Sequence, residues 1–234
     1  MKPKMTYIMP SIRDTFFKSA YKSVLNQTVK DIELIVVNND PERDIKIEDS
    51  RVSIINADRL NYAKSINLVT KQAQSDIIAI AHDDDIQFRE RTLIALDYHN
   101  QGYDIVYGGC IIIDYYGKPM AYKTPIPFDY ERQKRQSGMV TYAFISYKKE
   151  GIPDLRENYD ILSDYLWGLD CYNKGFTLKA VEMPFGYYRM WKSTSQSNKN
   201  LRFEEVLRMR KEFNDDTIKR GSWENENIVH NALA

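Results

Sequence analysis

The first 86 residues alternate short apolar runs with segments of helical periodicity, and this alternation limits the chain to few folds. The runs predicted as strands occupy residues 7–9, 32–37, 52–55 and 77–81. Two intervening segments, 13–25 and the stretch after Asn61, carry apolar side chains three or four positions apart, as one face of a helix does. Strands and helices that alternate in this way form a parallel sheet with right-handed crossovers. We therefore predict an α/β fold, with Asn61 as the N-cap of the second helix.

Residues 77–85 join a buried strand to clustered acidic side chains. The apolar run 77–81 leads directly into His82, Asp83, Asp84 and Asp85. Two carboxylates about 5 Å apart repel each other by roughly 3 kcal/mol at an effective dielectric of ~20. The carboxyl ends of strands in open α/β sheets are where ligands bind, and oxygen ligands suit Mg²⁺ or Mn²⁺. The stretch therefore predicts a cation site at this edge of the sheet, with a solvated acidic turn as the alternative.

The overall composition argues against several classes of protein. Lys plus Arg and Asp plus Glu both number 33 in the 234 residues, so the formal net charge is zero and gives no reason to expect a nucleic-acid partner. The sequence has no long apolar run and no signal-peptide pattern at its start, so we predict no transmembrane segment and a soluble, cytoplasmic protein. Cys110 and Cys171 lack metal-site spacing and are predicted to be reduced core residues.

The second half of the chain is less regular. Helices are predicted at 88–100, 161–173 and 201–218, and strands at 105–107, 110–113, 139–146 and 178–181. Residues 118–138 lack periodicity and are predicted to form a long loop, residues 184–186 a turn, and residues 192–200 a flexible stretch. Because no repeat or biased linker marks a boundary, we predict one domain.

Several short motifs follow one another along the chain. They are Tyr7–Arg13 (YIMPSIR), Ser23–Thr28 (SVLNQT), Glu33–Asp40 (ELIVVNND), Ala63–Ala73 around Asn67, Asp83–Asp85, Tyr159–Phe176 and Tyr188-Arg189. With these motifs, the chain from Tyr7 to about Ser197 resembles the family 2 glycosyltransferases of the GT-A fold. Each motif alone is weak evidence for the family, but the order of the motifs and the numbers of residues between them together match those of the family.

The resemblance implies a fold and an activity. The fold is of GT-A type: a Rossmann-like, mostly parallel central sheet flanked by helices, with a mixed acceptor-side half. One domain, 1–234, would comprise a nucleotide-binding half (1–100), an acceptor-binding half (101–200) and a C-terminal helix with its tail (201–234). Family members transfer a sugar from a nucleotide-diphosphate sugar, here with a UDP-sugar favoured, to a hydroxyl of a glycan, lipid-linked or protein acceptor. The implied reaction inverts the anomeric carbon and uses Mn²⁺ or Mg²⁺.

The resemblance also assigns roles to the residues at matching positions. Asp84, with Asp85, would bind the metal ion, and Asp83 would face the ribose. Arg189 would reach the diphosphate as a fixed cation. The other implied donor-binding residues are Pro10, Ser11 and Arg13, which lie where the first turn meets base and ribose, together with Asn39 and Asn67.

Asp164 is the candidate catalytic base. On a helical wheel it lies opposite the apolar cluster of Tyr165, Leu166, Leu169 and Tyr172, so it points away from the core. Its place in the first turn favours the carboxylate form through the helix dipole. The resemblance makes it the group that accepts the proton of the acceptor hydroxyl, whereas simple stabilisation of the helix is the alternative.

Five positions depart from the family's pattern. Asn38 and Asn39 stand where relatives carry Asp; an amide oxygen still accepts a hydrogen bond from uracil N3–H, but turn formation explains these residues equally well. His82 replaces an Asp of many relatives and has either a structural or a metal-binding role. Ser163 stands in place of a Glu that often contacts a sugar, and Trp191 stands where relatives often have a metal-binding His.

Two other functions fit parts of this pattern. A non-catalytic or degenerate sugar-nucleotide-binding protein is favoured by the departures and opposed by the presence of Asp84 and Asp164. A nucleotidyltransferase would need a glycine-rich first turn, which residues 10–13 lack. The charged helix at 201–218 leaves a peripheral membrane contact open, although packing on the domain is the simpler account.

Overall fold

A computed structural model of the chain describes residues 2–135, 142–191, 199–215 and 218. The strands of this described part are β1 (Met5–Ser11), β2 (Ile32–Asn38), β3 (Val52–Asn56), β4 (Ile77–Ile80), β5 (Ile86–Gln87), β6 (Ile105–Ile113), β7 (Pro119–Lys123), β8 (Ile145–Lys148) and β9 (Leu178–Arg189). The helices are α1 (Phe17–Leu25), α2 (Tyr62–Gln72), α3 (Arg91–Asn100), α4 (Tyr130–Arg135), α5 (Ser163–Asn173) and α7 (Lys199–Phe213), with a 3₁₀ turn at Tyr142–Phe144.

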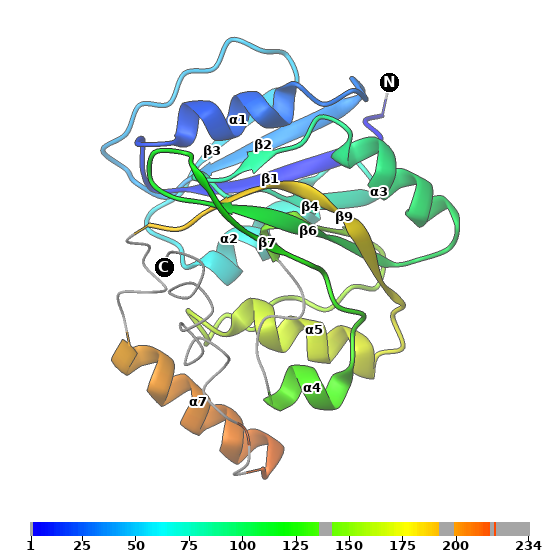
Figure 1. Ribbon diagram of the computed structural model, residues 1–234. Coiled ribbons are helices and arrows are strands. Elements are labelled where there is room, and N and C mark those ends of the chain that lie inside the picture. Colours follow the sequence, from blue (N-terminus) through cyan, green and yellow to red (C-terminus); the bar gives the residue numbers. More distant parts are fainter. Residues whose placement is uncertain (1, 136–141, 192–198, 216–217, 219–234) are drawn as a thin grey trace.

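All of these strands belong to one sheet, which helices cover on both faces (Figure 1). The strand order is β3-β2-β1-β4-β8-β6-β9-β5, and β7 pairs with β6 outside this path. Strands β1 to β4 pair in parallel, whereas β8 runs antiparallel to both β4 and β6. The sheet thus has a parallel first half and a mixed second half, which confirms the predicted fold class.

The two faces of the sheet bury separate apolar clusters because side chains alternate along each strand. In β1, Met5, Tyr7 and Met9 point to one face, where they pack with residues of α1 and α3. Ile8 points to the other face, where it packs with residues of α2 and α5. Asn61 caps α2 by accepting a hydrogen bond from the N–H of Lys64 (2.9 Å), which confirms the predicted N-cap.

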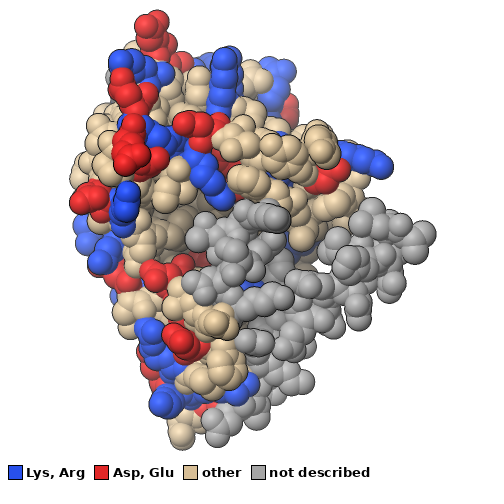
Figure 2. All heavy atoms as spheres, turned by 90° about the vertical axis from the view of Figure 1, so that its left-hand side faces the viewer, with Lys and Arg blue, Asp and Glu red and all other residues tan. Residues whose placement is uncertain are grey.

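A third apolar cluster joins α5 to α7. Leu166 and Leu169 of α5 are fully buried together with Val206 and Met209 of α7. Helix α7 therefore packs on the domain, which is the simpler of the two accounts given for the charged helix predicted at 201–218. Among the described residues, no helix has the length and apolar content needed to cross a membrane. On the face drawn in Figure 2, side chains of both charge signs are interspersed, in agreement with the zero net charge.

The predicted loop at 118–138 is wrong in its described part. A turn at 114–117, in which Gly117 has a φ of +89°, leads into β7, and β7 forms a hairpin with β6. Helix α4 follows, packed against α5. The strands predicted at 105–107 and 110–113 are one continuous strand, β6.

The turn predicted at residues 184–186 is also wrong, because these residues lie inside β9. Gly186 pairs with Gln87 of β5, and the register of β9 against β6 shifts around Gly109 and Pro184. These irregularities accommodate a proline and a glycine within a strand. Helix α1 begins at Phe17, later than predicted, because the residues before it form a turn at the candidate site. Residues 139–141 of a predicted strand, and 192–198 of the predicted flexible stretch, lie outside the described residues.

Candidate functional site

The three aspartates lie at the carboxyl end of β4, next to the carboxyl end of β1. Because β1 and β4 are parallel neighbours, the turn after Ser11 and the turn after Ala81 meet at one edge of the sheet. Oxygen Oδ2 of Asp83 accepts hydrogen bonds from Ser11 Oγ (3.1 Å), Ile12 N (3.1 Å) and Arg13 N (3.3 Å). Asp83 therefore fixes the first turn of the chain against the aspartate cluster. The structure brings Ser11, Arg13 and Asp83 together, and their predicted contacts with a donor nucleotide stay predictions.

Asp84 lies under two side chains from distant parts of the chain. Its Oδ2 accepts a hydrogen bond from the indole Nε1 of Trp191 (2.8 Å) and lies 3.5 Å from Nη2 of Arg13. The Arg13 guanidinium also lies 4.9 Å over the indole ring. Burial, with the nearby charge of Asp85, raises the pKa of Asp84. Trp191 thus contacts the residue predicted to bind a metal ion.

Asp85 is buried and keeps one carboxylate oxygen free of hydrogen bonds among the described residues. Its Oδ1 accepts from the backbone N–H of Arg189 (2.8 Å), whereas Oδ2 lies 3.5 Å from Nδ1 of His82 and has no hydrogen-bond partner there. The other ring nitrogen of His82 lies 3.0 Å from the hydroxyl of Tyr62. Burial lowers the pKa of His82, but its contact with Asp85 and the other carboxylate charges outweigh burial, so the net shift is upward.

Three of these side chains form a group of ligand atoms that suits a divalent cation. His82, Asp84 and Asp85 each offer one ligand atom, and the three atoms lie within 4.8 Å of one another. A buried carboxylate oxygen without a partner is costly unless a cation or another donor satisfies it. The two carboxylates match the preferences of Mg²⁺ or Mn²⁺ when water and phosphate complete the shell, whereas the imidazole of His82 is the less usual ligand for these ions. The residues present therefore fit the predicted metal ion.

Asp164 lies in the first turn of α5, half-buried, with Oδ1 accepting from the N–H of Tyr165 (2.7 Å). Burial raises its pKa, while the Tyr165 N–H and the charges of His82 and Lys123 oppose that rise. Asp164 is thus within electrostatic range of the histidine of the aspartate cluster. The predicted apolar face of α5 is confirmed for Tyr165, Leu166 and Leu169, which are buried, but not for Tyr172, which is 49% exposed.

Arg189 is buried and holds the aspartate cluster to the hairpin of β6 and β7. Its guanidinium donates to the backbone carbonyls of Asp84 (3.2 Å), Asp114 (3.1 Å) and Tyr115 (3.0 Å), and lies 4.0 Å over the ring of Phe16. These contacts engage most of the guanidinium within the protein. Its predicted contact with a diphosphate stays a prediction.

Asn38 and Asn39 have different surroundings. Asn38 donates to Arg43 O and to Asn56 Oδ1 and accepts from Asp40 N. The bond from Asp40 N, two residues on, is the contact by which Asn commonly stabilises a turn. Asn39 donates from Nδ2 to Ser65 Oγ (2.9 Å). The Ser65 hydroxyl in turn donates to a backbone carbonyl (3.0 Å), so it must accept from the Asn39 amide nitrogen.

That network leaves the amide oxygen of Asn39 pointing away from its partner. This Oδ1 is buried and has no hydrogen-bond partner among the described residues. Asn67, by contrast, is satisfied by the protein itself: it accepts from Leu155 N (2.8 Å) and donates to Leu155 O (2.9 Å) and Glu157 Oε1 (3.0 Å). Pro10 pairs with Val37 in the sheet one residue before the first turn. The structure thus leaves an open acceptor at Asn39 and none at Asn67.

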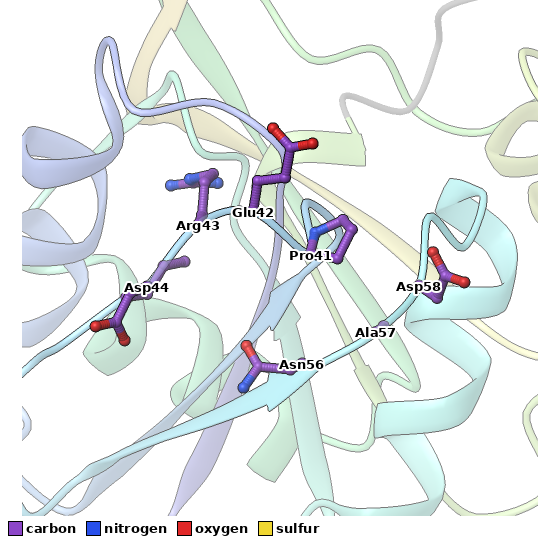
Figure 3. A pocket seen from close by; sticks show the side chains of 8 residues that line it. Pro41, Glu42, Arg43, Asp44, Asn56, Ala57 and Asp58 are labelled. Carbon is purple, nitrogen blue, oxygen red and sulfur yellow. The ribbon is translucent and has the colours of Figure 1, made fainter.

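Arg43 is a residue of this edge that no sequence motif singles out. Its guanidinium donates to Ser11 Oγ (3.0 Å) and to Asp14 Oδ1 (3.0 and 2.5 Å), so the loop after β2 is tied to the first turn. Arg43 also lines a pocket of about 430 Å³ between residues 41–45 and 56–58 (Figure 3). This pocket flanks β2 and β3 and includes none of the predicted site residues.

Two of three comparisons with known proteins found similar proteins. A model of glycosyl transferase family 2 matches residues 8–153. The sequence has no significant match among curated protein sequences. Among solved structures, TarS of S. aureus in complex with UDP-GlcNAc has a TM-score of 0.66 at 14% identity, and covers 98% of this chain and 71% of that one.

Two further structures show the same fold. TarS in complex with UDP has a TM-score of 0.64 at 15% identity over 80% of this chain. The mannosyltransferase PcManGT from Pyrobaculum calidifontis, in complex with GDP-Man and Mn²⁺, has a TM-score of 0.64 at 12% identity over all of this chain and 70% of that one. The chain spans only 60% of the length of the UDP-bound TarS. Because the family match covers more than half of the sequence, the chain belongs to glycosyl transferase family 2.

Proposed function

We propose that the protein transfers a sugar from a nucleotide-diphosphate sugar, preferably a UDP-sugar, to an acceptor hydroxyl with inversion. The observation that carries this proposal is the shared surroundings of Tyr62. Burial raises the pKa of Tyr62, and the charges of Asp164 and Asp85 both add to that rise. The Tyr62 hydroxyl also lies 3.0 Å from Nε2 of His82 in the aspartate cluster. These contacts support the proposal that a candidate base on α5 and candidate metal ligands after β4 face one site, as an attacking oxygen and a departing diphosphate require.

Asp84 and Asp85, with His82 beside them, are proposed to hold Mn²⁺ or Mg²⁺. When bound there, such an ion neutralises the charge that develops on the diphosphate as it leaves. Oδ2 of Asp85 supports this assignment, because among the described residues it has no hydrogen-bond partner, although His82 Nδ1 lies 3.5 Å from it. At Asp84 the ion would share or displace the hydrogen bonds of Trp191 and Arg13.

The donor base is proposed to lie against the first turn and Asn39. Because Asn39 presents an acceptor oxygen, it suits a base with a ring N–H, such as uracil or guanine. Cytosine carries an acceptor at the same ring nitrogen and would face Asn39 without a hydrogen bond. The two structural neighbours bind UDP-GlcNAc and GDP-Man, whose bases both have such an N–H. Pro10, Ser11 and Arg13 would lie along the base and ribose, with Asp83 holding that turn in place.

Asp164 is proposed to act as the general base. It takes the proton from the acceptor hydroxyl while that oxygen attacks the anomeric carbon. The bond from this carbon to the diphosphate oxygen breaks on the opposite side, so the configuration inverts. A raised pKa brings the carboxylate closer to the operating pH of a base, which strengthens its pull on the proton. The acceptor class, whether glycan, lipid-linked or protein, stays a prediction, as does a peripheral membrane contact.

A second candidate is a sugar-nucleotide-binding protein without turnover. The observation in its favour is that Arg13 and Trp191 already occupy the carboxylate of Asp84, which would otherwise be open to an ion. The two candidates differ in what an added metal ion does.

Calorimetric titration separates them. UDP, GDP and CDP are titrated into the wild type and into Asp84→Ala, each with and without Mn²⁺. The proposal expects UDP or GDP to bind more tightly with Mn²⁺, and expects this dependence to vanish in Asp84→Ala. Nucleotide binding of equal affinity with and without Mn²⁺ favours the sugar-nucleotide-binding protein without turnover. If none of the three nucleotides binds, the proposed donor site is refuted.

A further inference from the structure

Glu205 of α7 binds the backbone just before the candidate base. Its side chain is 1% exposed, and its carboxylate accepts hydrogen bonds from the N–H groups of Asp160 (2.6 Å), Ile161 (3.0 Å) and Leu162 (2.9 Å). Three successive N–H groups directed at one anion form a backbone nest. Asp164 follows this nest by two residues, so the path of the chain into Asp164 depends on a side chain of another helix.

Helix α5 has no side-chain cap of its own in the described structure. Its N-cap residue is Leu162, which has no acceptor in its side chain, whereas helices usually begin at Ser, Thr, Asp or Asn. Glu205 supplies an anion beside the amino end of α5, where the exposed N–H groups and the helix dipole favour negative charge. Hydrogen bonds to a carboxylate are also stronger than those between neutral groups.

Residues 155–162, the segment that precedes α5, also contact α2 on the side away from α7. Asn61 donates from Nδ2 to Asp160 Oδ1 (2.8 Å) and to Glu157 O (2.8 Å). Asn67 bonds to both backbone groups of Leu155. Helix α2 also carries the tyrosine that contacts the histidine of the aspartate cluster. The segment therefore lies between the donor side of the site and α7.

Further contacts from α7 reach the same segment. Arg208 donates to Asn158 O (2.5 Å) and lies 4.8 Å over the ring of Tyr159. Glu212 accepts from the Tyr159 hydroxyl (2.8 Å) and pairs with Arg156 (2.5 Å). Polar side chains of α7 thus hydrogen-bond to this segment, and Glu205 bonds to residues 160–162, which directly precede α5 and the candidate base.

We propose that Glu205 is a positioning residue for the sugar transfer, and that α7 is part of the catalytic unit. Glu205 holds residues 160–162 and so sets the placement of Asp164 against the donor site. It acts through the backbone and touches no reacting atom. This inference rests on the proposed function, and the family match, which ends at residue 153, contains neither residue.

The variant Glu205→Gln tests this role. It preserves the size of the side chain but removes the charge and replaces one of the two acceptor oxygens with an NH₂ donor that faces backbone N–H groups. The assay follows release of UDP from UDP-GlcNAc, or of GDP from GDP-mannose, in Mn²⁺ with water as the acceptor. We expect kcat to fall about 10- to 100-fold, because a displacement of ~1 Å can cost about 10²-fold, while KM for the donor stays nearly unchanged. The exposed neighbour Glu204 provides the matched control, Glu204→Gln, which keeps wild-type kinetics.

Amide hydrogen exchange tests the same contact without any turnover. In the wild type, the amides of residues 160–162 are expected to be protected, and in Glu205→Gln they are expected to exchange at least about tenfold faster. The amides of β1 and β4 should not change. If Glu205→Gln does not fold, the partly exposed Arg208→Ala replaces it, with the same direction of effect on kcat and on exchange.

The outcomes separate this inference from the proposed function. Unchanged kcat or unchanged exchange at 160–162 in a folded variant overturns the positioning role. An equal loss of kcat and of donor affinity also overturns it, because that pattern indicates general damage to the site. A wild type that hydrolyses neither donor contradicts the proposed function instead, and the exchange rates then still decide whether Glu205 holds the segment.

Discussion

The imidazole of His99 makes the stability of the fold depend on pH. His99 lies on α3, is 4% exposed, and has Nδ1 3.0 Å from Tyr103 O and Nε2 2.9 Å from Ser146 Oγ. The neutral ring satisfies both contacts, since Nδ1–H donates to the carbonyl and Nε2 accepts from the hydroxyl. Burial is the main cause that lowers the pKa of His99 from 6.5 to about 4.

The sign of the effect follows from proton binding. Between pH 6.5 and about 4 the unfolded chain binds a proton at this residue and the folded protein does not, so acid favours unfolding. The free energy of unfolding should therefore fall as the pH drops below 6.5. A difference of this size in pKa corresponds to roughly 3 kcal/mol in total, of which roughly 1.4 kcal/mol is lost by pH 5.5.

Urea unfolding of the wild type and of His99→Gln at several pH values isolates this contribution. Glutamine has a donor and an acceptor but does not titrate, so the other titrating groups cancel in the difference between the two proteins. We expect the wild type to lose stability relative to His99→Gln by about 1–2 kcal/mol between pH 7.5 and 5.5. Parallel stability curves over this range would show that His99 titrates normally in the folded protein and would refute the reasoning.

Four further substitutions have outcomes that the structure predicts. Asp164→Asn should lower kcat for donor hydrolysis about 10²- to 10⁴-fold while calorimetry shows unchanged nucleotide binding; a fully active variant would remove Asp164 as the base. Asn39→Ala should weaken UDP or GDP binding by about 1–2 kcal/mol, roughly 5- to 30-fold, and leave CDP unaffected, whereas an equal effect on all three nucleotides would place the base elsewhere. In Gly186→Ala the new Cβ would overlap the carbonyl oxygen of Ile86, so denaturant unfolding should show that the free energy of unfolding falls by about 3 kcal/mol. Gly168→Ala in α5 is the control: its Cβ would lie 3.5 Å from the nearest atom, so this variant should lose less than about 1 kcal/mol.

The parts of the fold that follow from local patterns were predictable from the sequence. The parallel strands of the first half are short, apolar and separated by amphipathic helices, and each of these features is a property of neighbouring residues. The edge at which Ser11 and Asp83 meet follows from strand direction alone, because parallel strands end on the same side. Asn61 was predictable as an N-cap because capping involves only the next few residues.

The remainder depends on contacts between distant residues. Residues 184–186 contain proline and glycine, which favour a turn locally, but pairing with β5 and β6 holds them in a strand. Trp191 bonds to Asp84 across 107 positions of the chain, so no local motif indicates that contact. Likewise, Asn67 matches a family motif, yet its amide is fully used by residues about 90 positions away. Nothing in the neighbouring sequence distinguishes Glu205 from the other charged residues of its helix. Its role depends on the fold, which brings its carboxylate to the N–H groups of residues 160–162.

Asp164 and the candidate metal ligands are proposed to perform an inverting displacement at one site. Proton NMR of the sugar first released from UDP-GlcNAc or GDP-mannose, with Mn²⁺ present and water as the acceptor, reads out the stereochemistry of that step. Both donors carry α-linked sugars, so we expect the β-anomer to form first in the wild type and Asp164→Asn to release almost none. Initial release of the α-anomer would rule out inversion, and undiminished release by Asp164→Asn would rule out Asp164 as the base.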